Sequence, residues 1–353
     1  MRLIVFGLTL SSSWGNGHAT LWRGLSRALA NRGHQILFFE RNVPYYALNR
    51  DLTRWDDGEL VLYEDWIEVK ERARVAMAQA DVVIITSFCP DALSAYEVSL
   101  EAAKGLKVFY DLDTPVTLAE YQQNGNVAYV PRQGLRRFDL VLSFAGGQAP
   151  ALLKQVLGAR EVAILYAHVD PKVHHPSEQC EAYQANLSYL GTFASGRQDA
   201  LEQFFIEPAR QLTDKRFLIG GALYPKNFPW LPNIHFVRHL PPSEHPQFFS
   251  SSDLTLNVTR PFMAKMGFCP SGRLFEAAAC QTPILSDDWS GIEEFFKPGE
   301  EILLVKKTAD VVDALALEAD ALNRLGAAGR RRALAQHTSE HRACELEEII
   351  KHL

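Results

Sequence analysis

Residues 270–294 read PSGRLFEAAACQTPILSDDWSGIEE, a helix pattern followed by a strand pattern. The apolar run Leu274–Cys280 predicts a buried helix, and residues 283–287 predict a short strand. One carboxylate, Glu276, lies inside the apolar run, although an uncompensated charge is costly in a core. Three more acids gather at the far end of the strand: Asp287, Asp288 and Glu293. This unit therefore carries acids that plain packing does not require.

The alternation of short apolar runs with amphipathic runs extends along the whole chain. Strands are predicted over residues 2–7, 34–40, 81–87, 107–113, 139–144 and 162–167, and again over 187–193, 216–222, 234–240, 253–259, 283–287 and 301–305. Because helical patterns separate most of these strands, the sequence predicts βαβ crossovers and parallel sheets. The fold class is therefore α/β, with two Rossmann-like doubly wound domains.

A polar segment without periodicity separates the two sets of strands, and we interpret residues 170–186 as a linker. We expect a first domain over residues 1–169 and a second over residues 187–334. A length of 353 residues suits two domains.

Charge and cysteine content limit the classes of partner and location. The net charge of −6, without a dominant basic segment, disfavours nucleic acid. The five cysteines are odd in number and form no CxxC pair, which favours a reducing, cytoplasmic location over a disulfide framework or structural zinc. No run of about 20 apolar residues is present, so we expect no transmembrane segment, while peripheral membrane association stays open.

The first predicted strand leads into a glycine-containing loop. Gly15 and Gly17 permit tight turns, and free N–H groups at a helix start favour an anion or a sugar hydroxyl. His18 at this helix start is a candidate catalytic residue, and an ordinary βα turn is the alternative. The candidates for acceptor binding are Trp14, Gly15, Asn16 and Gly17. A nicotinamide site is disfavoured because Thr20 stands where the third glycine belongs, although Glu40 ends the second strand.

Two aspartates follow another strand of the first half, in FYDLDTP. Asp111 and Asp113 can bind hydroxyls, accept a proton or hold a metal, and we take both as catalytic candidates. Turn formation ahead of Pro115 is the alternative.

In the second half, a loop with Gly191 leads to Arg197 at a helix start, where the guanidinium and the helix N-terminus suit a diphosphate. A surface arginine is the alternative. Further along, Ser271 can cap the next helix, and Glu276 one turn later can accept hydrogen bonds from vicinal ribose hydroxyls. The alternative is an Arg273–Glu276 ion pair, worth roughly 0.2–0.5 kcal/mol. The donor-binding candidates from this reasoning are Gly191, Arg197, Ser271, Gly272, Arg273, Glu276, Asp288 and Glu293.

Three motifs resemble a known family. The segment FEAAACQTPILSDDWSGIEEFFKPGEEILLV resembles the glycosyltransferase group 1 signature EAMACGTPVIA…GGIPE, and its R-x-x-E-A-A-A-C and G-I-E-E-F-F-x-P-G-E-E patterns are most similar to the CgeB-type family, named for spore maturation proteins. AHVDPKVHHP is similar to the GVDxxxFxP linker of GT-B enzymes. HTSEHRACEL resembles the C-terminal HTxxxR helix of that family.

The resemblance implies a GT-B fold, in which the second domain holds a nucleotide-sugar donor, the first holds the acceptor, and the last helix, about residues 335–353, packs back on the first domain. It implies that Glu276 binds the ribose and that Arg197 neutralises the diphosphate. The loop implied to approach the donor sugar is Gly291, Ile292 and Glu293. Phe268 stands where many group 1 enzymes carry a glutamate, so the stereochemistry of transfer stays open.

We therefore expect a metal-independent, hexosyltransferase-like glycosyltransferase without a cofactor. It would move a sugar from a nucleoside diphosphate to an unidentified acceptor, which is a glycan, a lipid-linked molecule or a small molecule. The alternatives are a GT-B-shaped nucleotide-sugar epimerase or hydrolase, and a catalytically degenerate binding or scaffold protein.

Overall fold

The computed structural model describes residues 1–353, and the chain divides into two compact units. The first unit comprises residues 1–13, 17–166 and 339–353, and the second comprises residues 14–16 and 167–338. The structure thus divides the chain near residues 166 and 338, where the sequence suggested 169 and 334. It groups the expected linker, residues 170–186, with the second unit.

The first unit is built on a seven-stranded sheet in which every pair of neighbouring strands is parallel. The strands are β1 (Arg2–Gly7), β2 (Gln35–Arg41), β3 (Glu59–Tyr63), β4 (Val82–Thr86), β5 (Leu106–Asp111), β6 (Leu140–Ser143) and β7 (Val162–Ile164). Their order is β3-β2-β1-β4-β5-β6-β7. Most residues of the central strands are fully buried, as expected for a parallel sheet with covered faces.

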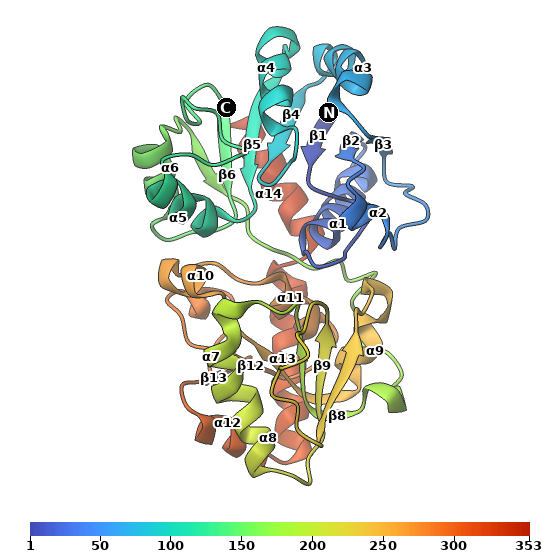
Figure 1. The fold of residues 1–353 in the computed structure, drawn as a ribbon, viewed down its shortest axis with the longest axis vertical. Coiled ribbons are helices and arrows are strands. Elements are labelled where there is room, and N and C mark those ends of the chain that lie inside the picture. The colour runs from blue at the N-terminus through green and yellow to red at the C-terminus, as the bar shows by residue number, and fades with distance from the viewer. The chain divides into compact units, whose positions relative to one another are not determined.

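Helices connect and cover these strands (Figure 1). They are α1 (His18–Asn31), α2 (Pro44–Ala47), α3 (Trp66–Ala78), α4 (Ala92–Ala102), α5 (Thr114–Asn124), α6 (Ala149–Leu157) and α14 (Ser339–Lys351). The C-terminal helix α14, red in Figure 1, joins the first unit and packs against α1. Arg32 donates to both carboxylate oxygens of Glu347, at 2.8 and 2.6 Å, and His34 lies 2.6 Å from the same carboxylate.

The second unit repeats the architecture with a six-stranded parallel sheet of order β10-β9-β8-β11-β12-β13. Its strands are β8 (Ala185–Leu190), β9 (Phe217–Gly221), β10 (Ile234–Arg238), β11 (Ser252–Asn257), β12 (Ile284–Asp287) and β13 (Leu303–Val305). Its α-helices are α7 (Gln198–Leu201), α8 (Glu207–Gln211), α9 (His245–Ser250), α10 (Pro261–Met266), α11 (Gly272–Ala279), α12 (Thr308–Ala314) and α13 (Ala319–Gln336). Short 3-10 or π segments are η1 (Glu181–Tyr183), η2 (Ser195–Arg197), η3 (Glu202–Ile206), η4 (Pro242–Glu244) and η5 (Ile292–Glu294).

Each sheet has one point where the strand order reverses, between β1 and β4 in the first unit and between β8 and β11 in the second. Ligands of open α/β sheets bind beyond the carboxyl ends of the strands at such points. The loops that follow β1, β8 and β11 therefore lie where each unit is built to bind.

The sequence analysis did not predict the strand β3 or the helices α2, α5 and α10. The C-terminal part of the chain forms three helices, α12, α13 and α14. None of the helices combines the length and the apolar character that a membrane crossing requires.

Attachment of α14 gives a first prediction. Hydrogen bonds from Arg32 and His34 lower the pKa of Glu347 from 4.5 to about 2. Stability from this group is present above pH 4.5 and lost as the pH falls toward 2. We expect Glu347→Gln to lower the free energy of unfolding by about 1 kcal/mol at pH 7. Urea denaturation at pH 7 and pH 3 measures this loss, which shrinks at the lower pH.

Glu348→Gln is the matched control, because Glu348 is exposed and pairs with Lys351 one turn away on the same helix. Its effect stays within about 0.5 kcal/mol. Equal effects of the two substitutions would contradict the role of Glu347 in holding α14.

Candidate functional site

In the second unit, the loop after β8 brings Gly191 and Arg197 to the switch point. A Cβ at Gly191 would lie 2.7 Å from the Tyr189 hydroxyl, so any larger residue would force the Tyr189 ring to move. The Arg197 guanidinium donates through Nη2 to the Thr192 carbonyl, while its Nε is buried without a hydrogen-bond partner.

Positive charge converges on the buried hydroxyl of Tyr189, which has no hydrogen-bond partner. Burial raises the pKa of Tyr189, and the charges of Arg197, Arg273 and Arg260 act in the opposite direction. Arg197 at the end of η2, Arg260 directly before α10 and Arg273 in the first turn of α11 therefore act on one point at this edge of the sheet, which suits an anionic ligand.

Helix α11 begins beside these arginines with a cap and a buried acid. The Ser271 hydroxyl accepts from the Arg273 N–H at 3.3 Å, the usual N-cap arrangement. Arg273 donates through Nη1 to Oε2 of Glu276, so the ion pair considered from the sequence exists. The other oxygen, Oε1, has no hydrogen-bond partner within the protein and faces Gly272, where a Cβ would lie 4.0 Å from it. A side chain at position 272 would contact this oxygen, and glycine does not.

Two buried histidines complete the surroundings of Glu276. His174 Nε2 lies 3.2 Å from His245 Nδ1, and these two nitrogens lie 4.0 and 3.8 Å from Glu276 Oε2. His245 Nε2 lies 3.2 Å from the Leu240 carbonyl, which only accepts, so Nε2 carries the proton and Nδ1 accepts. Burial lowers the pKa of both histidines, for His245 well below 6.5, which keeps the pair neutral near pH 7.

This His174–His245–Glu276 cluster is also the group of side chains whose geometry could hold a metal. A point equidistant from the three atoms lies about 2.1 Å from each, a normal length for zinc ligands. The Arg273 guanidinium, however, contacts two of the three atoms, Glu276 Oε2 and His245 Nδ1. A cation already compensates the carboxylate, and a second cation would face its charge.

The remaining donor-binding candidates lie on the loops after β12 and before α11. Asp288 pairs with Lys306 at 2.8 Å, Ile292 is buried, and Glu293 is exposed. Gly291 has φ 90°, and a Cβ there would lie 2.4 Å from the Phe268 ring. Phe268 therefore packs against the loop of Gly291. This is the position at which many group 1 enzymes carry a glutamate, and the loop is the one that the resemblance places near the donor sugar.

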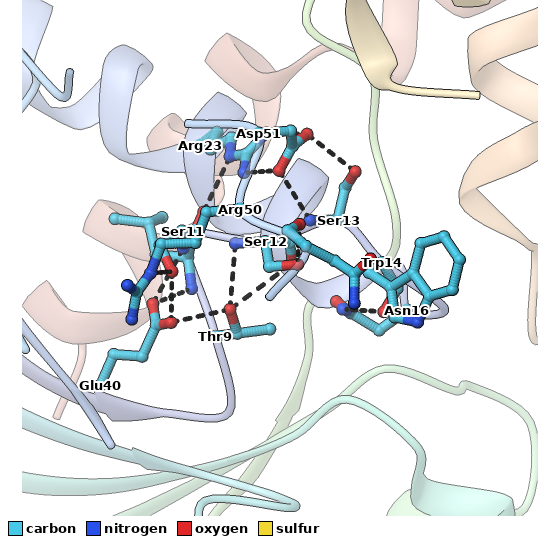
Figure 2. Close-up of polar contacts among 12 residues, drawn as sticks. Thr9, Ser11, Ser12, Ser13, Trp14, Asn16, Arg23, Glu40, Arg50 and Asp51 are labelled. Atoms are coloured by element: carbon cyan, nitrogen blue, oxygen red, sulfur yellow. Dashed lines mark hydrogen bonds and ion pairs between the residues drawn. The ribbon is translucent and has the colours of Figure 1, made fainter. Parts of the chain in front are cut away.

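In the first unit, the loop after β1 is held by a buried carboxylate (Figure 2). Glu40 at the end of β2 accepts from the N–H groups of Leu10 and Ser11 at 2.6 and 2.8 Å. It also accepts from the hydroxyls of Ser11 and Thr9, at 2.5 and 3.0 Å. Each oxygen of Glu40 thus accepts two hydrogen bonds from the protein. This leaves no acceptor for a nicotinamide ribose, in agreement with the incomplete glycine fingerprint.

A second anchor holds the next part of this loop, as Figure 2 shows. Asp51 accepts from the N–H and hydroxyl of Ser13 at 2.9 and 2.8 Å and from Arg23 at 2.8 and 3.0 Å. Burial works to raise the pKa of Asp51, and the hydrogen bonds and charge of Arg23 lower it overall. Of the acceptor-binding candidates that follow, Trp14 is buried, Gly15 has φ 67°, and the Asn16 amide donates to the Trp14 carbonyl. Gly17 precedes α1 as its cap residue.

The three catalytic candidates lie together in the first unit. His18 Nε2 at the start of α1 lies 3.0 Å from Oδ2 of Asp113, and both residues are at most 8% exposed. Because a carboxylate accepts, Nε2 is the protonated nitrogen, and Nδ1 is left buried without a hydrogen-bond partner.

Asp111 is fully buried and accepts from the Thr117 hydroxyl at 2.8 Å and the Asp113 N–H at 3.2 Å. Burial raises its pKa to about 7. The hydrogen bond from the Asp113 N–H shows that Asp111 holds the backbone at Asp113 in place. A catalytic role of Asp111 itself stays a prediction.

Sequence reasoning did not find His174 and His245. His174 lies in the segment interpreted as a linker, and His245 lies in a short helix about 70 residues further on. Neither has a local pattern, and only the folded chain brings them to Glu276.

Solved structures show what this architecture is. Sucrose-phosphate synthase of Thermosynechococcus elongatus matches with a TM-score of 0.73 at 15% identity, covering 99% of this chain and 98% of that one. HepE of Anabaena in complex with UDP-glucose matches with 0.72 at 13% identity over 100% of both chains. An α-glucosyltransferase in complex with UDP matches with 0.74 at 13% identity, over 99% and 100%. The fold is therefore GT-B, as the sequence predicted.

Residues 197–348 match a family model described as glycosyl transferase-like. This domain and the fold together support the GT-B glycosyltransferase superfamily. None of the curated proteins matches the sequence.

The Glu40 anchor gives the second prediction. Glu40→Gln replaces one carboxylate oxygen, which accepts from two donors in a buried loop, by an NH2 group that only donates, so two donors lose their acceptor. We expect a loss of about 1–3 kcal/mol in the free energy of unfolding, measured by urea denaturation. Glu59→Gln, an exposed acid paired with Arg72, is the control and changes it by less than about 0.5 kcal/mol. Equal stability of the Glu40→Gln protein and the wild type would disprove the anchor.

Proposed function

We propose that this protein is a glycosyltransferase that moves a sugar from a nucleoside-diphosphate sugar to an acceptor hydroxyl. The observation that carries the proposal is the arrangement at α11: a buried glutamate with one oxygen held by Arg273 and the other oxygen open beside Gly272. Uridine diphosphate sugars are the first candidates, because HepE and the α-glucosyltransferase were solved with UDP-glucose or UDP. A hexose is the sugar we expect.

The donor half of the site lies in the second unit. Oε1 of Glu276 accepts from the ribose hydroxyls, and the diphosphate lies near Arg197 and Arg273. When the bond between the anomeric carbon and the diphosphate oxygen breaks, negative charge grows on the leaving group, and arginines stabilise it without a metal. Nη2 and Nε of Arg273 have no partner within the protein and are available for this role.

The acceptor half is formed by His18 of the first unit and by the loop of residues 14–17 that precedes it. Asp113 holds the proton of His18 on Nε2, so Nδ1 presents a lone pair. In our proposal Nδ1 takes the proton of the acceptor hydroxyl as its oxygen bonds to the anomeric carbon and the nucleoside diphosphate departs. A base of this kind serves transfer with inversion.

The five cysteines are all free, which supports a reducing, cytoplasmic location.

The rival functions differ in what they consume. An epimerase or hydrolase would use the nucleotide sugar at full rate without an acceptor. A degenerate scaffold would bind it and never turn it over.

A binding measurement tests the donor half. We expect Glu276→Ala to weaken UDP or UDP-glucose binding at least about tenfold in titration calorimetry, because ribose hydroxyls lose a charged acceptor. Glu300→Gln, an exposed acid paired with Lys297, serves as control and leaves the affinity unchanged. Unchanged affinity of Glu276→Ala would refute the ribose role.

Turnover tests the acceptor half once a thermal-shift screen of nucleotide sugars has identified the donor. His18→Gln should lower kcat by about 10²–10⁴ and leave UDP affinity unchanged, because a lost base affects only the chemical step. NMR of the product should show the anomeric configuration opposite to that of the donor. A retained configuration, or normal turnover of His18→Gln, would remove His18 from this role.

A further inference from the structure

The donor half-site contains a chain of hydrogen bonds, here called the relay, that runs from Glu276 through Arg273 and His245 to the backbone carbonyl of Leu240. The Leu240 carbonyl accepts the N–H of His245 Nε2 at 3.2 Å, which fixes the tautomer and leaves Nδ1 as an acceptor. Arg273 Nη1 lies 3.1 Å from this Nδ1 and also donates to Oε2 of Glu276. A guanidinium Nη1 has two hydrogens, and here each has one acceptor. His245 is therefore the second acceptor that fixes the plane of the guanidinium.

We propose that His245 is a positioning residue of the donor site: it holds the guanidinium of Arg273 so that Glu276 keeps Oε1, and Arg273 keeps Nη2 and Nε, for the ligand. This inference rests on the proposed function. The geometry makes the neutral imidazole necessary, because a proton on Nδ1 would set a donor against Arg273.

His174 restricts the same relay from the other side. Its side chain is completely buried, and Nε2 lies 3.2 Å from His245 Nδ1. Because His245 Nδ1 is unprotonated, His174 Nε2 is the donor of this contact, and it holds the His245 ring through the same nitrogen that accepts from Arg273. Arg273, in contrast, is about a third exposed, so its guanidinium needs a partner to stay beside the carboxylate.

Two substitutions separate hydrogen bonding from packing. His245→Leu introduces an apolar side chain of similar size and removes the acceptor, whereas His245→Asn places an amide oxygen near the position of Nδ1. With UDP as the probe in titration calorimetry, we expect His245→Leu to weaken binding about tenfold and His245→Asn to stay within about twofold. Equal affinity of His245→Leu and the wild type, or an equal loss in both variants, overturns the inference.

A double-mutant cycle shows whether His245 acts through Arg273. In the Arg273→Ala background, His245→Leu should cause no further loss of UDP affinity, because the group that it orients is gone. Additive losses would overturn the relay. Melting temperatures of all four proteins identify any variant that fails to fold.

A measurement without a nucleotide keeps the inference separate from the proposed function. If the wild type does not bind UDP, that result counts against the proposed donor, and the state of His245 is then read by ¹⁵N NMR of the imidazoles at pH 7. We expect the neutral tautomer with the proton on Nε2. The opposite tautomer or a charged ring overturns the relay, as does stoichiometric Zn²⁺ binding that His245→Leu abolishes, since the cluster would then be a metal site.

Discussion

A carboxylate buried on an apolar helix needs compensation for the charge that it carries away from water, and at Glu276 that requirement organises its neighbours. Arg273, one turn earlier, supplies the positive charge, but a guanidinium brings more donors than one oxygen can accept. His245 takes a second donor, and the Leu240 carbonyl fixes which nitrogen of His245 does so. One acid thus determines the orientation of residues from three separate segments of the second unit.

Other buried acids in this chain meet the same requirement in a different way. Glu40, Asp111 and Asp287 lie at the carboxyl ends of strands and accept N–H or hydroxyl groups from the segments that follow β1, β5 and β11. Their hydrogen bonds hold the loops at the binding edge of each sheet. Glu276 differs, because it lies on a helix, uses a cation for one oxygen and leaves the other oxygen without a protein partner. Glu40, Asp111 and Asp287 therefore hold loops in place, whereas Glu276 has one oxygen that can still accept a hydrogen bond from a ligand.

The period of the hydrophobic pattern accounts for what the sequence could predict. Buried central strands such as β1 and β4 are continuous apolar runs, and the amphipathic helices between them require parallel sheets. β3 was not predicted because it is an edge strand whose burial alternates. α5 was not predicted because it begins at Thr114, directly before a proline, and a proline there is also typical of a turn. At the site, Ser271, Arg273 and Glu276 are neighbours on one helix and were found from local spacing. The contacts of Glu276 with His174 and His245 depend on the folded second unit, so no local rule could supply them.

Backbone strain indicates which edge of each sheet is used. Five residues other than glycine have positive φ, a conformation that costs on the order of 1–3 kcal/mol. Phe88, Leu223 and His239 follow the carboxyl ends of β4, β9 and β10, and Phe268 lies in the loop that leads into α11. Gln281 is the exception, because it follows the C-terminal end of α11 and so lies away from the carboxyl ends of the strands. A sheet that served packing alone would gain stability by relaxing these loops. Their persistence at the edge where α/β proteins bind ligands, with His239 directly before the Leu240 carbonyl that holds His245, argues that the strained loops are shaped for a ligand.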